Sequence, residues 1–322
     1  MQEDSTLNAR VRTGTTYATY TGIMTPKLKT FLKRGFSTVI LLAVLGGALW
    51  LNEPIGYGIL ICLLCNLTTW EWFNMLEGSG TNRWLVLIGG VTYPWGILAV
   101  LRTMSSELLR SPLEYIAIPM MLLIVFALIA FICELFSMDY RGKTADVALA
   151  SVSRTVLAFI YPVWLFSFSL FFINEQYAVN ILLWLILFTK MSDIWAYVSG
   201  VLLGGKFIKR RFSPVVSPKK TWEGIIGSVI ITLVCGGFLL PVLIDIPFWD
   251  TEDILIYVAL AIPLFFIAVA GDLAGSLIKR GLAVKDSGSL LPGIGGIFDL
   301  IDSPAFTVSS FVALGSLCAI FA

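Results

Sequence analysis

The 322-residue sequence contains no histidine, and only 13% of its residues are charged. Soluble domains carry about 25% charged residues, so a chain with 57% hydrophobic residues and a mean hydropathy of +0.88 belongs to the membrane class. The absence of histidine removes the commonest general base and the commonest zinc ligand. A net charge of +1 leaves no basic excess for binding nucleic acid.

Cysteine is also scarce, with 5 residues in the whole chain. All of them lie in apolar runs, where packing is a better explanation than a disulfide framework or a zinc site. Cys62 and Cys65 form a C-x-x-C pair, but they lie inside a predicted membrane span. Cysteine chemistry is therefore not expected to carry the function.

Long apolar runs dominate the rest, and roughly 20 apolar residues cross a bilayer as a helix. We predict an all-α fold, a polytopic integral membrane helical bundle of about nine transmembrane helices. The predicted spans are 36–51, 54–76, 83–101, 113–136, 155–173, 179–203, 222–244, 254–275 and 303–321. We expect a polar cytoplasmic tail at 1–35 without a secretory signal, N-terminal transmembrane helices at 36–176, and a C-terminal transmembrane region at 177–322 that carries the catalytic site.

Basic residues predict the orientation, because cytoplasmic loops of membrane proteins are enriched in Lys and Arg. With the N-terminus inside, almost all of the 22 basic residues fall in cytoplasmic segments. The opposite face has only Arg102 and Arg110, and its loop at 245–253 is acidic. This alternation predicts an N-in/C-out protein whose active site faces the cytoplasm, in a membrane such as the bacterial inner membrane.

The first chemical candidate is a charged pair inside the span 179–203. Asp193 follows Lys190 by three residues, so the two share a helical face. A carboxylate within a span is costly and marks a functional site or a structural ion pair, and both interpretations are kept. The same face continues through Ala196, Gly200 and Gly204, small residues that let another helix approach closely.

The second candidate is the stretch Ser217-Pro218-Lys219-Lys220-Thr221. Ser followed by Pro is typical of a helix start, with Ser217 as the cap. The free N–H groups and dipole of a helix start, together with two lysines, predict an anion site suited to phosphate.

The third candidate follows in the chain. Asp272, Ser276, Lys279 and Arg280 share a helical face at the end of the span 254–275. Next comes a loop with Lys285, Asp286 and the glycines Gly293, Gly295 and Gly296, whose backbone N–H groups could wrap around an anion. Asp299 and Asp302 then lie three residues apart on one helical turn, where helix capping is the plainer alternative.

Carboxylates beside lysines and arginines that attract phosphate predict Mg²⁺, which proteins hold through oxygen ligands and substrate phosphates. Without histidine or a reactive cysteine, the expected chemistry is metal-assisted phosphoryl or nucleotidyl transfer. Glu71 and Glu134 fall near cytoplasmic span ends, where snorkelling or a cap-like role is the preferred interpretation.

These residues resemble the signature of the phosphatidate cytidylyltransferase (CDP-diacylglycerol synthase) family. The motif runs S-x-x-K-R, four residues, K-D, then L-P-G-x-G-G-x-x-D-x-x-D, and it begins here at Ser276 and ends at Asp302. The S-P-K-K-T-W-E-G and S-D-x-x-A-Y segments resemble the same family, and the likeness covers about residues 185–305. The sequence departs from the pattern at Ile294, where the family usually has His, and at Leu300, where it usually has Arg.

The resemblance implies transfer of CMP from CTP to phosphatidic acid, giving CDP-diacylglycerol and pyrophosphate. From the residues themselves we expect Asp193 and Asp272 to coordinate one or two Mg²⁺ ions, with Asp299 and Asp302 either as further ligands or as groups that support those ligands. A monovalent cation is a further candidate cofactor. We expect catalytic roles for Lys219, Lys220, Lys279, Arg280, Lys285 and Asp286, and substrate binding by Ser217, Thr221, Ser276, Gly293, Gly295 and Gly296. The expected partners are CTP, phosphatidic acid and the lipid bilayer, with a homodimer expected from base rates alone.

Two other functions stay open. A CTP-dependent lipid kinase, acting on a polyprenol-type alcohol, would transfer the γ-phosphate and would need a base for the hydroxyl proton. A membrane transporter would spread polar residues through the bilayer midplane, whereas here they gather toward one surface.

Overall fold

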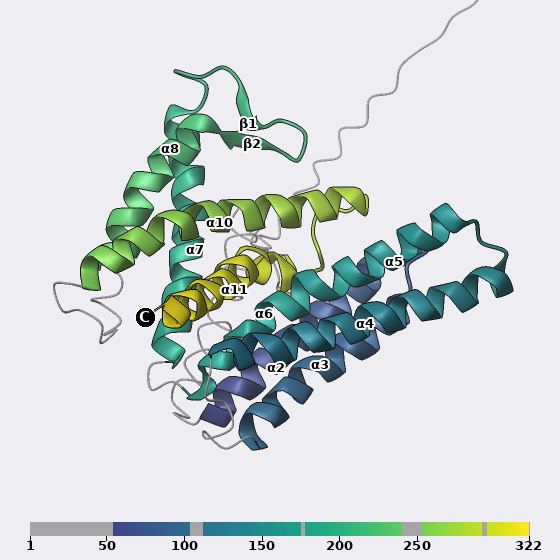
Figure 1. Ribbon diagram of the computed structural model, residues 1–322. Coiled ribbons are helices and arrows are strands. Elements are labelled where there is room, and N and C mark those ends of the chain that lie inside the picture. Colours follow the sequence, from purple (N-terminus) through teal and green to yellow (C-terminus); the bar gives the residue numbers. More distant parts are fainter. Residues whose placement is uncertain (1–53, 104–111, 175–177, 240–252, 292–294, 322) are drawn as a thin grey trace, which may run out of the picture.

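The computed structural model describes residues 54–103, 112–174, 178–239, 253–291 and 295–321. The predicted tail at 1–35 and the predicted first span at 36–51 lie outside these residues, as does Gly293. From 54–76 onward, each predicted span coincides with a helix. The protein is thus an all-α membrane protein, whose described strands form one small hairpin (Figure 1).

The helices of the N-terminal half are α2 (Pro54–Met75), α3 (Arg83–Thr103), α4 (Pro112–Arg141) and α5 (Ala145–Phe159). The last continues through a π-helical turn η1 (Ile160–Trp164), a short α6 (Leu165–Ser167) and a 3₁₀ segment η2 (Phe168–Asn174). Pro162, which has no backbone N–H to donate, lies in this π-helical turn.

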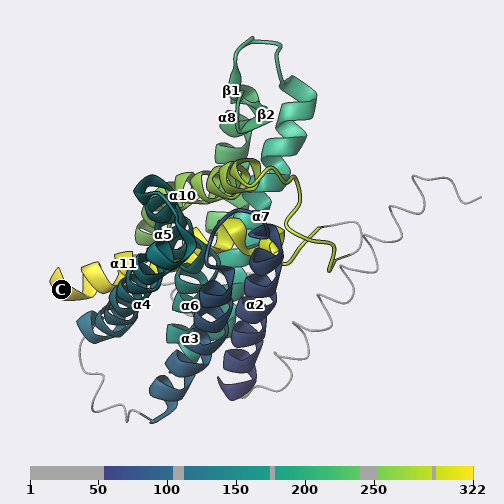
Figure 2. The same cartoon turned by 90° about the vertical axis from the view of Figure 1, so that its right-hand side faces the viewer.

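The C-terminal half begins with α7 (Ala178–Leu203), followed by strands β1 (Arg211–Ser213) and β2 (Ser217–Thr221). Helix α8 (Trp222–Ile231) runs into the π-helical segment η3 (Thr232–Leu239), and α10 (Asp253–Gly281) and α11 (Phe298–Phe321) complete the chain. Helix α7 packs on α8, and α10 packs on α11. The β1–β2 hairpin projects from the shared end of α7 and α8 (Figure 2).

Five described helical segments are long and apolar enough to cross a membrane: Arg83–Thr103, Ile116–Met138, Ala145–Ile173, Val179–Leu203 and Ala259–Gly281. Many large apolar side chains on these helices are exposed, as expected where a helix faces lipid. The total of nine spans and the N-in/C-out orientation stay predictions.

An aromatic cluster joins the N-terminal and C-terminal halves of the chain. The ring of Phe298, at the start of α11, lies 5.2 Å from Trp72 of α2 and 5.3 Å from Tyr161 of η1, both in edge-on geometry. All three side chains are buried. Edge-to-face contacts add specific geometry to apolar burial, so the cluster holds the beginning of α11 against the N-terminal helices.

Candidate active site

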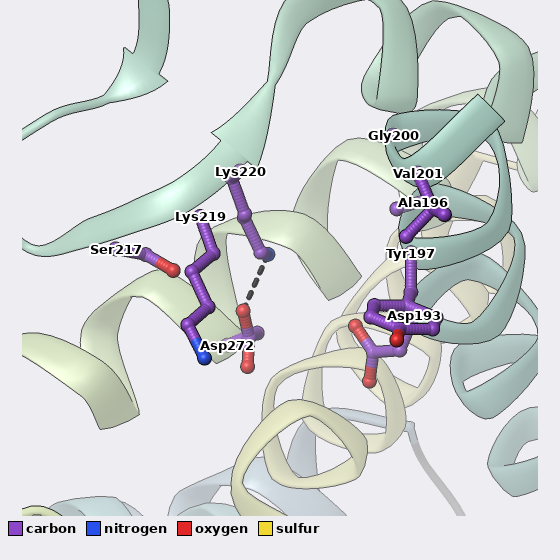
Figure 3. A pocket seen from close by; sticks show the side chains of 9 residues that line it. All are labelled: Asp193, Ala196, Tyr197, Gly200, Val201, Ser217, Lys219, Lys220 and Asp272. Carbon is purple, nitrogen blue, oxygen red and sulfur yellow. Dashed lines mark ion pairs between the residues drawn. The ribbon is translucent and has the colours of Figure 1, made fainter. Parts of the chain in front are cut away.

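A cavity of about 450 Å³ lies between α7, β2 and α10. Figure 3 shows Asp193 entering from α7, Lys219 and Lys220 from β2, and Asp272 from α10. Ser217, Ala196, Tyr197, Gly200 and Val201 complete the lining. Three elements that are separate in the sequence therefore supply one pocket with acidic and basic groups.

Glycines let α7 and α8 approach closely beside this pocket. A Cβ on Gly224 of α8 would lie 2.6 Å from the carbonyl oxygen of Ala196, and one on Gly200 would lie 3.2 Å from Thr221 Oγ1. The small-residue face predicted on α7 is thus confirmed, and α8 is the helix that approaches it. This contact holds β2, which leads directly into α8, beside Asp193.

The predicted helix start at Ser217 is wrong. Residues Ser217–Thr221 form β2, which pairs antiparallel with β1, and the helix begins at Trp222. Thr221 is the N-cap, because its side-chain oxygen accepts a hydrogen bond of 3.0 Å from the amide of Gly224. Strand pairing therefore competes successfully with the capping signal of Ser-Pro, and Lys219 and Lys220 project from a strand.

Close contact between α10 and α11 places the remaining aspartates. A Cβ on Gly275 would lie 2.9 Å from Asp302 Oδ2, and one on Gly271 would lie 3.0 Å from the Cα of Ser303. The hydroxyl of Tyr161 donates to the carbonyl oxygen of Gly271 at 2.7 Å. No local sequence pattern distinguishes Gly271, Gly275 or Tyr161, because their role depends on which helices meet.

Lysines link the carboxylates of the site. Lys220 forms an ion pair with Asp272, drawn as a dashed line in Figure 3. Lys190 Nζ lies 3.9 Å from Asp193 Oδ2 and 3.9 Å from Asp302 Oδ1. Asp193 was predicted to be either part of a structural ion pair or part of a functional site. It does pair with Lys190, and it also lines the pocket.

A second lysine joins the two aspartates of α11. Lys279 Nζ lies 2.6 Å from Asp299 Oδ1 and 3.6 Å from Asp302 Oδ2. The predicted shared face of Asp299 and Asp302 is therefore confirmed, although neither residue lines the cavity. Burial raises the pKa of Asp299, but hydrogen bonds from Lys279, Gly296 and Ser287 outweigh it and hold the pKa below its ordinary value. Asp299 is thus a carboxylate at neutral pH.

The loop before α11 does bind anions through its backbone, but the anions are the protein's own carboxylates. The amides of Ser287 and Gly296 donate to Asp299 Oδ2 at 3.2 and 3.0 Å. The amides of Ile297 and Phe298 donate to Glu71. The expected external anion is therefore replaced at these four amides, and Gly295 contributes a left-handed backbone turn with φ of 133°.

Several predicted site residues lie outside the cavity. Arg280, Lys285 and Asp286 are exposed and do not line it, and Arg280 donates to the carbonyl oxygen of Val284 at 3.3 Å. Ser276 is partly buried on α10 and also does not line the cavity. Leu300, where the related signature has a basic residue, packs against the hydrophobic core.

Glu71 is the main residue that sequence reasoning undervalued. It is only 3% exposed, so snorkelling is wrong, whereas its bond to the first amide of α11 is a cap-like role. A carboxylate within an apolar span is a functional candidate by default, and that signal was present in the sequence.

The oxygen donors of the cavity fit one particular mode of Mg²⁺ binding. Within the described residues, no three Asp, Glu or Cys side chains form a ready-made metal cage. Asp193 and Asp272 nevertheless offer hard oxygen donors to one cavity. Mg²⁺ is commonly held by one or two carboxylates plus substrate phosphates, so the pocket suits an ion that binds together with a polyphosphate.

Comparison with known proteins places the chain in a family. The model of the cytidylyltransferase family matches residues 32–318. Because this match covers most of the chain, the protein belongs to the cytidylyltransferase family.

Individual relatives agree with this assignment. A phosphatidate cytidylyltransferase of Haemophilus influenzae is 27% identical over 282 residues, which are 87% of this chain and 96% of the relative. A phosphatidate cytidylyltransferase of Helicobacter pylori is 34% identical over 182 residues, 56% of this chain and 64% of the relative. Phosphatidate cytidylyltransferase 4 of Arabidopsis chloroplasts is 40% identical over 122 residues, 37% of this chain and 29% of the relative. The last two matches span less than two thirds of those relatives' own length.

Proposed function

We propose that this protein transfers the CMP group of CTP to phosphatidate, giving CDP-diacylglycerol and pyrophosphate. The observation that carries the proposal is the cavity where Lys219 and Lys220 meet Asp193 and Asp272. Membership of the cytidylyltransferase family supplies the reaction class. The Haemophilus relative, a phosphatidate cytidylyltransferase matched over 96% of its length, supplies the lipid substrate.

The lysines would answer the main physical obstacle, which is the repulsion between a triphosphate and a lipid phosphate. Lys219 is exposed on β2 and forms no ion pair with any described residue, so its charge is available to a phosphate. Lys220 is paired with Asp272 at the cavity wall and is thereby held in place before substrate binds. Preorganised charge of this kind stabilises the charge that develops in a transition state.

The chemical step needs no general base from the protein. A phosphate monoester is already largely ionised near neutral pH, so its oxygen can attack the α-phosphorus of CTP directly. The new P–O bond forms as the bond to pyrophosphate breaks, and the leaving group takes the electron pair. A chain without histidine is suited to this reaction.

Mg²⁺ belongs to the proposal as a cofactor, with Asp193 and Asp272 as its protein ligands. When bound, the ion would neutralise phosphate charge and orient the triphosphate. Asp299 and Asp302 would act from behind the cavity, because both bond Lys279 and Asp302 also lies beside Lys190. The monovalent cation and the homodimer remain expectations from the sequence.

The placement in the membrane is also part of the proposal. The concentration of Lys and Arg near the pocket favours a cytoplasm-facing site by the positive-inside rule, with the bacterial inner membrane as the host. This orientation would let CTP approach from water and let phosphatidate arrive within the bilayer.

Labelled CTP tests the proposal with purified protein, phosphatidate and Mg²⁺. Label at the α-phosphorus should enter the lipid, and pyrophosphate should be released in equal amount. Label that enters a lipid alcohol from the γ-position, with CDP as product, would instead establish the lipid kinase. Omitting Mg²⁺ should stop the reaction, and full activity with a chelator present would remove the ion from the proposal.

A further inference from the structure

Glu71 is a buried carboxylate of α2 that the proposed chemistry does not use. Its Oε1 accepts a hydrogen bond of 2.8 Å from the amide of Ile297, and its Oε2 accepts one of 2.9 Å from the amide of Phe298. The hydroxyl of Ser287 lies 3.0 Å from the same Oε2. The side chain of Glu71 thus connects α2 to a loop that lies more than 200 positions later in the sequence.

Two glycines of the loop have a specific reason to be glycine. A Cβ on Gly288 would lie 2.8 Å from Glu71 Oε1, and one on Gly296 would lie 2.3 Å from Glu71 Oε2. Backbone therefore packs directly against the Glu71 carboxylate. Gly296 belongs to the glycine-rich motif that suggested a phosphate cradle, so here its packing partner is a carboxylate of the protein.

The loop passes this restraint on toward the cavity. Ser287 Oγ also lies 3.0 Å from Asp299 Oδ2, and Asp299 bonds Lys279. Lys279 contacts Asp302, and Lys190 lies between Asp302 and the cavity-lining Asp193. An unbroken series of polar contacts thus runs from α2 to the pocket.

We propose that Glu71 is a positioning residue for nucleotidyl transfer: it binds the loop before α11 and thereby holds the Asp299–Lys279–Asp302 cluster in register with Asp193. This inference rests on the proposed function, and it assigns to the N-terminal half a direct part in shaping the site. The carboxylate group is required because both of its oxygens accept from buried donors, and an amide offers only one such acceptor.

The test is Glu71→Gln in the full-length protein, with two readouts. The rate at saturating CTP should fall about 10- to 100-fold, as for loss of a supporting contact at a metal site, while KM for CTP stays unchanged because Glu71 does not line the cavity. Hydrogen exchange should become faster at the amides of Ser287, Gly296, Ile297 and Phe298. This second readout needs no turnover, so it separates failure of this inference from failure of the proposed function.

Glu134→Gln is the matched control. Glu134 is also 3% exposed and also lies in the N-terminal half, but its partner is Lys143. The Glu134→Gln variant should have lower thermal stability than the wild type. Its rate per folded molecule, and the hydrogen exchange of the four amides named above, should be unchanged. Wild-type kcat in folded Glu71→Gln, or unchanged amide exchange, would overturn the proposal.

A second variant covers the case in which Glu71→Gln does not fold. Ser287→Ala removes the hydroxyl between Glu71 and Asp299 but keeps both amide bonds to Glu71. It should lower kcat with KM unchanged and leave the amides of Ile297 and Phe298 protected. Wild-type kcat in this variant would contradict the series of contacts.

Discussion

The catalytic and structural roles of Asp272 can be separated by measuring the transfer rate and the folding stability of the same variant. Its ion pair with Lys220 joins side chains that are 25% and 17% exposed. Because both side chains are mostly buried and Lys220 would lose its partner, Asp272→Asn should cost about 1–3 kcal/mol of folding stability, between the costs for exposed and for fully buried pairs. Removing a preorganised charge from an active site typically costs about 100- to 1000-fold in rate, or about 2.7–4 kcal/mol of transition-state free energy.

The assay follows both quantities in the same preparation. Transfer of α-label into lipid at saturating CTP measures the rate, and a thermal melt in detergent measures stability. Glu77→Gln serves as the control, because it breaks an ion pair with Arg83 whose side chains are 72% and 28% exposed. An Asp272→Asn protein with wild-type rate and a clearly lower melting temperature would refute the reasoning, since Asp272 would then act only as the partner of Lys220.

Three further predictions follow from the same geometry. Lys219→Ala should raise KM for CTP about 10-fold or more, the expected loss of a charge-assisted contact, and an unchanged KM would exclude Lys219 from the nucleotide site. Thr221→Ala should cost about 1 kcal/mol of stability as a lost cap, whereas Ser217→Ala should leave the melting temperature unchanged; the opposite order would restore Ser217 as the cap. Gly224→Ala should cost about 1–3 kcal/mol through overpacking against Ala196, and a wild-type melt would show that α7 and α8 can separate at no cost.

Helices and shared helical faces were predictable where they depend on short sequence patterns. Apolar runs specify helices by length and composition, so each predicted span after the first coincides with a described helix. The spacing of Asp299 and Asp302 was enough to place both on one face, where each contacts Lys279. The face through Gly200 was recognisable as a contact surface because small residues permit close helix approach.

The predicted helix start at Ser217 failed because two local preferences compete, and the contacts of the loop before α11 were not predicted because their partner is distant in the sequence. Ser217 and Pro218 resemble a helix start, but pairing with β1 draws them into a strand and moves the cap to Thr221. The glycine-rich loop stays a predicted phosphate site, but the amides of Gly296 and Ile297 donate to the protein's own carboxylates, those of Asp299 and Glu71. Nothing in the local sequence of either segment indicates these partners.

By itself, the sequence determined the membrane class, the helical elements and the inventory of charged groups, because these depend on composition and on spacings of a few residues. Which charges face one another was decided by tertiary structure alone. Asp193, Lys220 and Asp272 meet because α7, β2 and α10 border one cavity, and Glu71 reaches Phe298 because α2 packs beside the start of α11. Such contacts join residues far apart in the chain, and only the packing of whole helices selects them.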